Sequence, residues 1–299
     1  MQSAPIDLAL VRKLFSRTEK RQPADFIYRE IAARMLERLQ LVRLDPHRVL
    51  DLGCGRAADL PVLQSHYPNA HIVGMDAAAA FLQLAMKQQT AARSSVQKLL
   101  SLFAADNNSQ AQLINADFCN TPLADDCADM IWSNLALHWH AEPDQVFKEW
   151  RRLLSVNGLL MFSCFGPDSL KEIRQAFDSD GGTPHTLPFV DMHDLGDMLA
   201  QAGFATPVMD MEIITLTYTS AEQLLTEVRA LGGNPLLTRQ KSLQGKYAWQ
   251  RMRAQLEAQR NADGRIPLTL EVIYGHAFKP VPKKINPGVN IIKFDKLTK

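Results

Sequence analysis

The stretch Val49–Ala57, V-L-D-L-G-C-G-R-A, has the residue types that bind a nucleotide-like cofactor. Asp51 closes an apolar run that is typical of a buried parallel strand. Gly53 and Gly55 then allow a tight backbone turn, with room for a ligand to approach closely. A second apolar run ends in another acid, Asp76, roughly 20 positions further on. This order of strand, glycine turn, helix, strand and acid predicts a cofactor site at the carboxyl ends of the strands.

Acids at three successive strand ends favour S-adenosylmethionine as that cofactor. Asp51 is placed to face the methionyl ammonium, and Asp76 to accept both ribose hydroxyls. Asp117 ends a third strand, where it can accept the adenine amino hydrogens while Phe118 packs beside the base. A buried carboxylate needs a donor or a cation, and this ligand offers both. We therefore predict that the cofactor is bound by Asp51, Gly53, Gly55, Asp76, Asp117, Phe118 and Asn134.

The glycine pattern leaves one other class of enzyme open. Gly53, Gly55 and Ala58 also satisfy the dinucleotide motif G-x-G-x-x-[G/A], which would indicate a nicotinamide- or flavin-dependent oxidoreductase. That motif alone is weak, and the acid two residues before the first glycine favours S-adenosylmethionine. Titration with each cofactor separates the two classes.

Polar and aromatic residues follow the fourth predicted strand, on the side where a methyl acceptor would lie. Asn134, His138 and Trp139 are therefore candidates to position the acceptor. For His138 the alternative is a histidine that only makes a structural hydrogen bond. His138 and His140 point to different sides of an extended chain, or lie askew on a helix, so we predict no metal site.

Strands and helices are expected to alternate around these residues. Residues 1–47 predict an N-terminal helical flap with a polar, basic break, and its second helix, from about Ala24 to Leu41, carries Phe26 on its apolar face. Repeated strand–helix–strand units over 48–164 imply a parallel sheet with right-handed crossovers. The segment 91–110 interrupts this rhythm as a surface insertion.

The last third of the chain predicts two further strands separated by helices. Residues 207–218 and 267–278 have the apolar patterns of strands, and 220–262 is mainly helical and basic. We expect 220–262 to form a helical cover over the acceptor pocket. Residues 280–299 form a lysine-rich tail without the pattern of a folded element.

The composition excludes several function classes. A chain of 299 residues with 46% hydrophobic residues can build a sizeable core. Its formal net charge of +1 argues against a general nucleic-acid binder. There is no apolar run long enough for a membrane span and no signal-peptide pattern, so we expect a cytoplasmic protein. Four cysteines without a C-x-x-C pair predict free thiols rather than a disulfide framework or a zinc site.

The motifs V-L-D-L-G-C-G-R-A, G-M-D, N-A-D-F and D-M-I-W-S-N-L-A-L-H-W resemble those of class I S-adenosylmethionine-dependent methyltransferases. The family pattern D-x-G-x-G-x-G is matched except at its last glycine, which is Ala57 here, and we expect binding to survive this methyl group. The resemblance implies a Rossmann-like α/β fold over 48–279, with a seven-stranded, mostly parallel sheet and helices on both faces. It also makes 220–262 a helical insertion before the last strand.

The later motifs, over roughly residues 10 to 279, resemble the malonyl-[acyl-carrier protein] O-methyltransferases of biotin synthesis. This resemblance implies methyl transfer to the free carboxylate of a malonyl thioester carried by acyl-carrier protein or coenzyme A. A carboxylate is already a nucleophile at neutral pH, so the enzyme needs positioning and a cation rather than a general base. Because the arginine fork matches a carboxylate, the candidate substrate-binding residues are Arg17, Arg174 and Arg229.

The flap departs from this family. After the F-S-R motif at Phe15–Arg17, the stretch T-E-K-R-Q-P lacks the tyrosine that the biotin enzymes carry near the methyl donor, and Tyr28 lies farther along the next helix. The flap and two later stretches resemble instead a mitochondrial relative, the methyltransferase-fold complex I assembly factor that hydroxylates an arginine. A protein-modifying relative, a non-catalytic assembly factor and another small-acid carboxyl methyltransferase therefore stay open as alternatives. The oligomeric state is not predicted.

Overall fold

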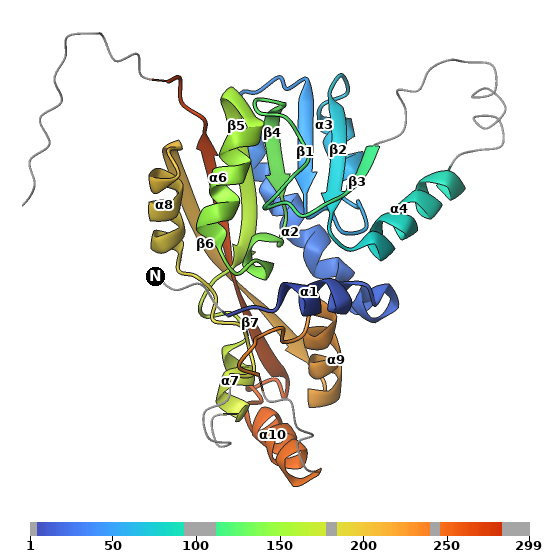
Figure 1. The fold of residues 1–299 in the computed structure, drawn as a ribbon. Helices are drawn as coiled ribbons and strands as arrows, with labels where there is room; N and C mark the ends of the chain where they lie inside the picture. Colours follow the sequence, from blue (N-terminus) through green and yellow to red (C-terminus); the bar gives the residue numbers. More distant parts are fainter. Residues whose placement is uncertain (1–4, 93–111, 178–183, 240–245, 283–299) are drawn as a thin grey trace, which may run out of the picture.

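A seven-stranded sheet with the order β3-β2-β1-β4-β5-β7-β6 forms the centre of the molecule (Figure 1). The computed structural model describes residues 5–92, 112–177, 184–239 and 246–282. β7 runs antiparallel to both neighbours, and the other neighbouring strands are parallel, which confirms the predicted mostly parallel sheet. The strands are β1 (Arg48–Leu52), β2 (His71–Asp76), β3 (Gln112–Asn115), β4 (Ala128–Ser133), β5 (Leu154–Phe165), β6 (Ala205–Tyr218) and β7 (Ile266–Phe278).

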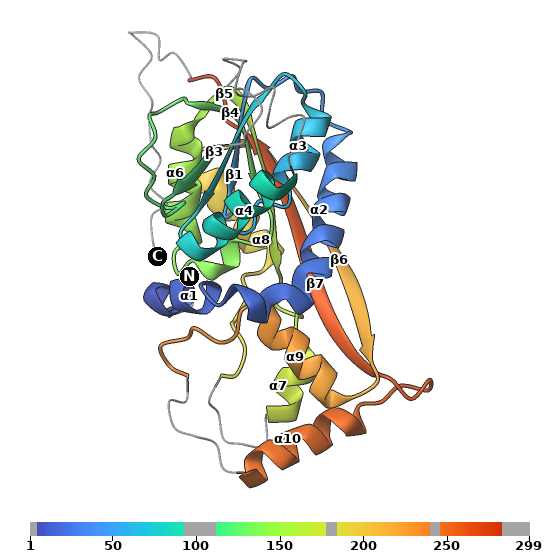
Figure 2. The same cartoon turned by 90° about the vertical axis from the view of Figure 1, so that its right-hand side faces the viewer.

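Helices cover both faces of this sheet (Figure 2). In β4, Trp132 packs into the core beneath one helical layer, and its neighbour Ile131 packs into the core beneath the other. Because both faces are covered, the central strands read as continuous apolar runs rather than alternating ones. One layer comprises α2 (Asp25–Leu39), α3 (Leu60–His66) and α4 (Ala79–Ala92), and the other α6 (Pro143–Leu153) and α8 (Met192–Gln201).

The N-terminal region divides into a crossing segment and a packed helix. α1 (Leu8–Phe15) and the 3-10 helix η1 (Thr18–Ala24) lie across the carboxyl ends of the strands (Figure 1), whereas α2 packs on the sheet. The expectation that Phe26 lies on the apolar face of α2 is wrong, since its side chain is 42% exposed. Ile27 and Ile31 belong to the buried stripe instead, because positions four apart share one side of a helix.

The long strands β6 and β7 extend beyond the rest of the sheet and carry a second group of helices (Figure 1). This group contains α7 (Lys171–Phe177), α9 (Ala221–Leu231) and α10 (Lys246–Ala258). The predicted helices within 220–262 are therefore present, and α9 contacts η1. The predicted insertion over 91–110 and tail over 280–299 lie almost wholly outside the described residues. Within the described part of the chain, every helix is too short or too polar to cross a membrane.

Candidate active site

A cavity of about 550 Å³ opens at the carboxyl ends of β1, β2 and β4. Its walls come from the turns after these strands and from α1, η1 and α2, so the crossing segment closes one side. This volume is typical of a pocket for a small molecule or a cofactor. Adjacent parallel strands bring their carboxyl ends to one crevice, which explains why residues far apart in sequence share this cavity.

The glycine turn is held by close contacts to neighbouring strands. The backbone N–H groups of Gly53 and Cys54 both donate to the carbonyl of Met75, at 2.8 and 3.0 Å. Gly53 has φ +81°, and a Cβ there would lie 2.3 Å from the Cβ of Ala136. Ala57, at the third glycine position of the family pattern, has φ +59° and so takes a left-handed conformation that costs an alanine energy.

Asp51 is a buried acid without a partner. It is only 1% exposed, and its Oδ2 has no hydrogen-bond partner among the described residues. Burial raises the pKa of this carboxyl well above its usual range, and the nearby charges of Asp59 and Asp76 raise it further. A carboxylate in such a place needs a cation. The ammonium of the methionyl group has the required charge, so this part of the cavity fits S-adenosylmethionine.

Asp76 lies beside the glycine turn, as predicted. Its Oδ2 accepts the N–H of Gly55 at 2.8 Å and its Oδ1 accepts that of Ala78 at 2.7 Å. These bonds lower the pKa of the carboxyl, while burial raises it and is the larger effect. The carboxylate is thereby fixed in orientation and lines the cavity, where its remaining lone pairs can accept ribose hydroxyls.

Asp117 and Phe118 take different positions. Phe118 lines the cavity, but Asp117 is not among the lining residues. Asp117 instead accepts a hydrogen bond from Arg12 of α1 at 2.8 Å, and from the N–H of Cys119 at 3.0 Å. The adenine-binding role of Asp117 stays a prediction. It requires this carboxylate to accept hydrogen bonds from both Arg12 and the adenine amino group.

Asn134 lines the cavity and joins three elements. Its Nδ2 donates to the carbonyl of Tyr28 at 2.9 Å and to Oδ2 of Asp59 at 3.2 Å. Its Oδ1 accepts the hydroxyl of Ser163 at 3.0 Å. Asp59 also accepts the indole N–H of Trp132 at 2.9 Å, which completes a buried network between α2 and the sheet.

Replacing Asn134 with alanine is expected to lower the free energy of unfolding by about 1–3 kcal/mol, because the carbonyl of Tyr28 and the hydroxyl of Ser163 lose a buried partner. Urea titration measures this change. Gln40→Ala, at an exposed position that ends α2, is the control. A loss at Asn134 no larger than the loss at Gln40 would contradict this role.

His138 does not line the main cavity, whereas Trp139 does. His138 is enclosed by the rings of Trp139, Phe165 and Phe189, and its Nδ1 lies 3.4 Å from the backbone nitrogen of Phe165. Burial lowers the pKa of His138 to about 3, so it is neutral and a poor proton acceptor at pH 7. Its Nε2 is buried and has no hydrogen-bond partner among the described residues, and the acceptor-positioning role of His138 stays a prediction.

The apolar side of the cavity is built from aromatic rings. Phe15 of α1 packs edge-on against Trp139, with ring centroids 5.1 Å apart, and against Phe81, at 5.9 Å. Gly232, which directly follows α9, approaches the indole of Trp139 so closely that a Cβ would lie 2.0 Å from it. The second group of helices therefore touches the wall of the cavity at Trp139.

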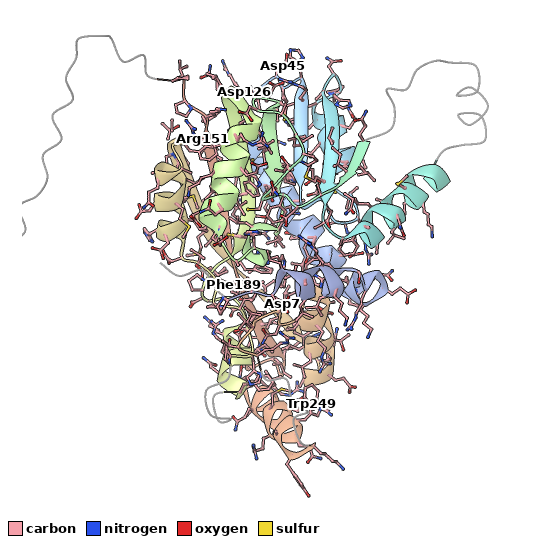
Figure 3. All side chains as sticks on the ribbon, viewed as in Figure 1. Asp7, Asp45, Asp126, Arg151, Phe189 and Trp249 are labelled. Atoms are coloured by element: carbon pink, nitrogen blue, oxygen red, sulfur yellow. The ribbon has the colours of Figure 1, made fainter. Side chains whose placement is uncertain are left out.

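The three predicted substrate-binding arginines do not line the cavity. Arg17 is exposed at the start of η1. Arg174 donates to the carbonyls of Ser169 and Pro167, both at 2.6 Å, and holds the turn before α7. Arg229 lies over the ring of Trp249, which is on α10 and far from the sheet's central strands (Figure 3). The arginines that line the cavity are Arg12, Arg21, Arg29 and Arg56.

Sequence reasoning missed Asp59, Tyr28 and the cavity position of Arg21. Arg21 is visible in the sequence as one of the basic residues of the flap, but only the fold distinguishes it from Arg17.

In the described ranges, no group of three or more histidine, cysteine, aspartate or glutamate side chains is arranged to hold a metal ion.

Known proteins are similar to this chain in sequence and in fold. Residues 50–162 match the methyltransferase domain family. The YcgJ protein of Bacillus subtilis superposes with a TM-score of 0.55 at 13% identity, covering 87% of this chain and 99% of its own. Phosphoethanolamine N-methyltransferase 2 from Haemonchus contortus, in complex with S-adenosylhomocysteine, superposes with a TM-score of 0.53 at 15% identity. The match covers 91% of this chain and 60% of the Haemonchus chain. At this identity, both structures support the fold alone.

Fold, glycine turn and domain match together define an S-adenosylmethionine-dependent methyltransferase, which confirms the predicted methyl donor. Two relatives show which family of methyltransferases the chain belongs to. The malonyl-[acyl-carrier protein] O-methyltransferase of Laribacter hongkongensis is 42% identical over 96% of both chains, and that of Gallionella capsiferriformans is 42% identical over 98% of both. The chain belongs to the family of malonyl-[acyl-carrier protein] O-methyltransferases.

Proposed function

We propose that this protein transfers the methyl group of S-adenosylmethionine to the free carboxylate of malonyl-[acyl-carrier protein], giving the malonyl methyl ester. The near full-length similarity to enzymes of that name supports the proposal. The structural observation that carries it is one cavity with the unpaired Asp51 in one part and the aromatic wall of Phe15, Phe81 and Trp139 in another. A cationic methyl donor and an acyl group of low polarity fit these two parts.

The cofactor-binding assignment rests on what the side chains offer. Asp51 is proposed to face the ammonium, and Asp76 the ribose hydroxyls, with its orientation fixed by the N–H groups of Gly55 and Ala78. Phe118 lines the cavity and is proposed to pack beside the adenine. Bound S-adenosylmethionine supplies a methyl group on a sulfonium sulfur, which is an activated leaving group.

The chain needs no general base for this reaction. The acceptor carboxylate is ionised at pH 7, so its oxygen can form the new bond to the methyl carbon as the bond from that carbon to sulfur breaks. In the described part of the cavity wall there is no histidine, and the neighbouring His138 is too weak a base to help. What the protein contributes is orientation of the two reactants and exclusion of water by Phe15, Phe81 and Trp139.

Methyl transfer from labelled S-adenosylmethionine to malonyl-[acyl-carrier protein] tests the proposal. We expect a labelled ester that base hydrolyses, and no label on acetyl-[acyl-carrier protein], which lacks the free carboxylate. Parallel assays with malonyl-coenzyme A compare the two carriers through their KM values. Binding of the cofactor without ester formation on either thioester would overturn the proposal in favour of a non-catalytic assembly factor or a protein-modifying relative.

A further inference from the structure

Arg21 is a buried cation in the wall of the cavity. It belongs to η1, it is only 4% exposed, and its guanidinium lies 3.8 Å from the centre of the Phe15 ring. Nη2 donates to the carbonyl of Leu231 at 2.5 Å and to the hydroxyl of Tyr28 at 3.2 Å. Nε is buried and has no hydrogen-bond partner among the described residues.

The other arginines of the cavity are engaged or exposed. Arg12 forms an ion pair with Asp117 at 2.8 Å, and Arg56 forms one with Asp25 at 2.7 Å. Arg29 is exposed and donates to the backbone carbonyl of Asp25 at 3.4 Å. Within the described residues, Arg21 is thus the buried arginine of this cavity that has no carboxylate within ion-pair distance.

A guanidinium buried against aromatic rings without an anion is in an unfavourable place, because it has lost water and gained no opposite charge. Both hydrogen bonds of Arg21 use Nη2, and the buried N–H of Nε has no partner among the described residues. A guanidinium N–H forms a strong, charge-assisted hydrogen bond with a carboxylate oxygen. The contacts to Leu231 and Tyr28 fix the guanidinium through Nη2, so Nε is the donor left for an anion in the cavity.

Arg21 lines the same cavity as the acid Asp76 and the aromatic residues Phe15 and Trp139. Its positive charge lowers the pKa of Asp76, at the end of β2, and that of His138, in the 3-10 helix η3 (Leu137–Trp139). The methyl group to be transferred must meet the acceptor within the cavity that Arg21 lines.

We propose that Arg21 binds the free carboxylate of the acyl acceptor and so selects acceptors that end in a carboxylate. This inference rests on the proposed methyl transfer and assigns the substrate contact within it. Nε would donate to the carboxylate, and Tyr28 and the carbonyl of Leu231 would hold Arg21.

The test compares Arg21→Met and Arg21→Lys with Lys20→Met, which removes an exposed cation from the same 3-10 helix. For Arg21→Met we expect the KM for malonyl-coenzyme A to rise about 10- to 100-fold, as for the loss of a hydrogen-bonded charged group. Arg21→Lys keeps the charge but loses the Nε donor and the planar guanidinium, so its KM should fall between those of Arg21→Met and the wild type. The Kd for S-adenosylhomocysteine should change less than about threefold in every variant, and Lys20→Met should match the wild type.

Calorimetric binding of malonyl-coenzyme A to the enzyme loaded with S-adenosylhomocysteine gives a readout without turnover. An analogue with an amide in place of the free carboxylate should bind Arg21→Met at least as well as it binds the wild type. An unchanged KM and an unchanged Kd for malonyl-coenzyme A in Arg21→Met would overturn the inference. If that variant does not fold, Arg21→Lys decides by the same measurements.

Two further outcomes are informative. A weaker Kd for S-adenosylhomocysteine with an unchanged KM for the acceptor would show that Arg21 holds the carboxylate of the cofactor itself, and would overturn the inference. Wild-type enzyme that binds malonyl-coenzyme A through Arg21 but forms no ester would overturn the methyl transfer and retain the Arg21 contact. A wild type that binds neither malonyl-coenzyme A nor malonyl-[acyl-carrier protein] would overturn both.

Discussion

Replacing Asp51 with asparagine is expected to remove most of the affinity for S-adenosylmethionine and, at the same time, to stabilise the ligand-free protein. The carboxylate is buried, and its Oδ2 has no hydrogen-bond partner among the described residues. Loss of one member of a buried charge pair costs about 2–5 kcal/mol of binding, so we expect the Kd to rise by about 30-fold or more. Without the cofactor, the same carboxylate opposes folding, because its burial and the neighbouring Asp59 and Asp76 disfavour its charge.

The dependence on pH gives this prediction a definite sign. The pKa of Asp51 in the folded protein is raised well above its value in the unfolded chain. Between these two pKa values the folded state binds a proton that the unfolded state does not, so stability falls as the pH rises through this interval. An asparagine amide does not titrate, so the advantage of Asp51→Asn should grow with increasing pH above about 4. Cofactor affinity of the wild type should rise over the same interval, as Asp51 ionises.

Calorimetric titration with S-adenosylhomocysteine and thermal unfolding at pH 5 and pH 8 measure both effects. Asp45→Asn is the control, since Asp45 is an exposed acid at the edge of the sheet opposite the cavity (Figure 3). A variant at Asp51 that binds the cofactor like the wild type would show that the ammonium lies elsewhere. A variant that is less stable than the wild type at pH 8 would show that the carboxylate has a partner in solution.

The cofactor part of the site could be predicted from the sequence because its signals are local. Asp51, Gly53 and Gly55 lie within one turn, and Asp76 ends the next strand of a parallel unit, so the rule that neighbouring strands converge was enough to bring them together. The repeated strand–helix–strand units predicted a parallel sheet, and the resemblance to a family implied seven strands. Neither the units nor the resemblance was used to predict the order of the strands.

The acceptor part could not be predicted, because it depends on contacts between distant residues. Arg21 is buried through its bond to Leu231, which is 210 positions away in the chain. Arg17, four positions earlier, lies at the start of the 3-10 helix and faces solvent, although both arginines have the same residue type and the same local composition. Tyr28 reaches the cavity because α2 begins at Asp25, one turn before it. The sequence does not predict the first residue of α2 to within one or two positions.

Three substitutions in the glycine turn are expected to separate backbone strain from steric overlap. Gly53→Ala should lower the free energy of unfolding by about 2–4 kcal/mol, because φ +81° is unfavourable for alanine and its Cβ would overlap that of Ala136. Gly55→Ala should lose only about 1 kcal/mol, since φ is +52° but the nearest atom to its Cβ is 4.0 Å away, on Phe81. Ala57→Gly should gain about 0.5–1 kcal/mol by relieving φ +59°.

Urea unfolding of the three variants measures the changes in the free energy of unfolding. Titration with S-adenosylhomocysteine measures how each substitution changes the affinity for the cofactor. We expect Gly53→Ala to lose at least about tenfold in affinity, because relief of the overlap must move the turn away from Ala136 and so displace the backbone that the cofactor approaches. Ala57→Gly should keep the affinity of the wild type, which would show that the departure from the family pattern is a cost in stability alone. Equal losses at Gly53 and Gly55 would mean that strain, rather than the contact with Ala136, requires a glycine in this turn.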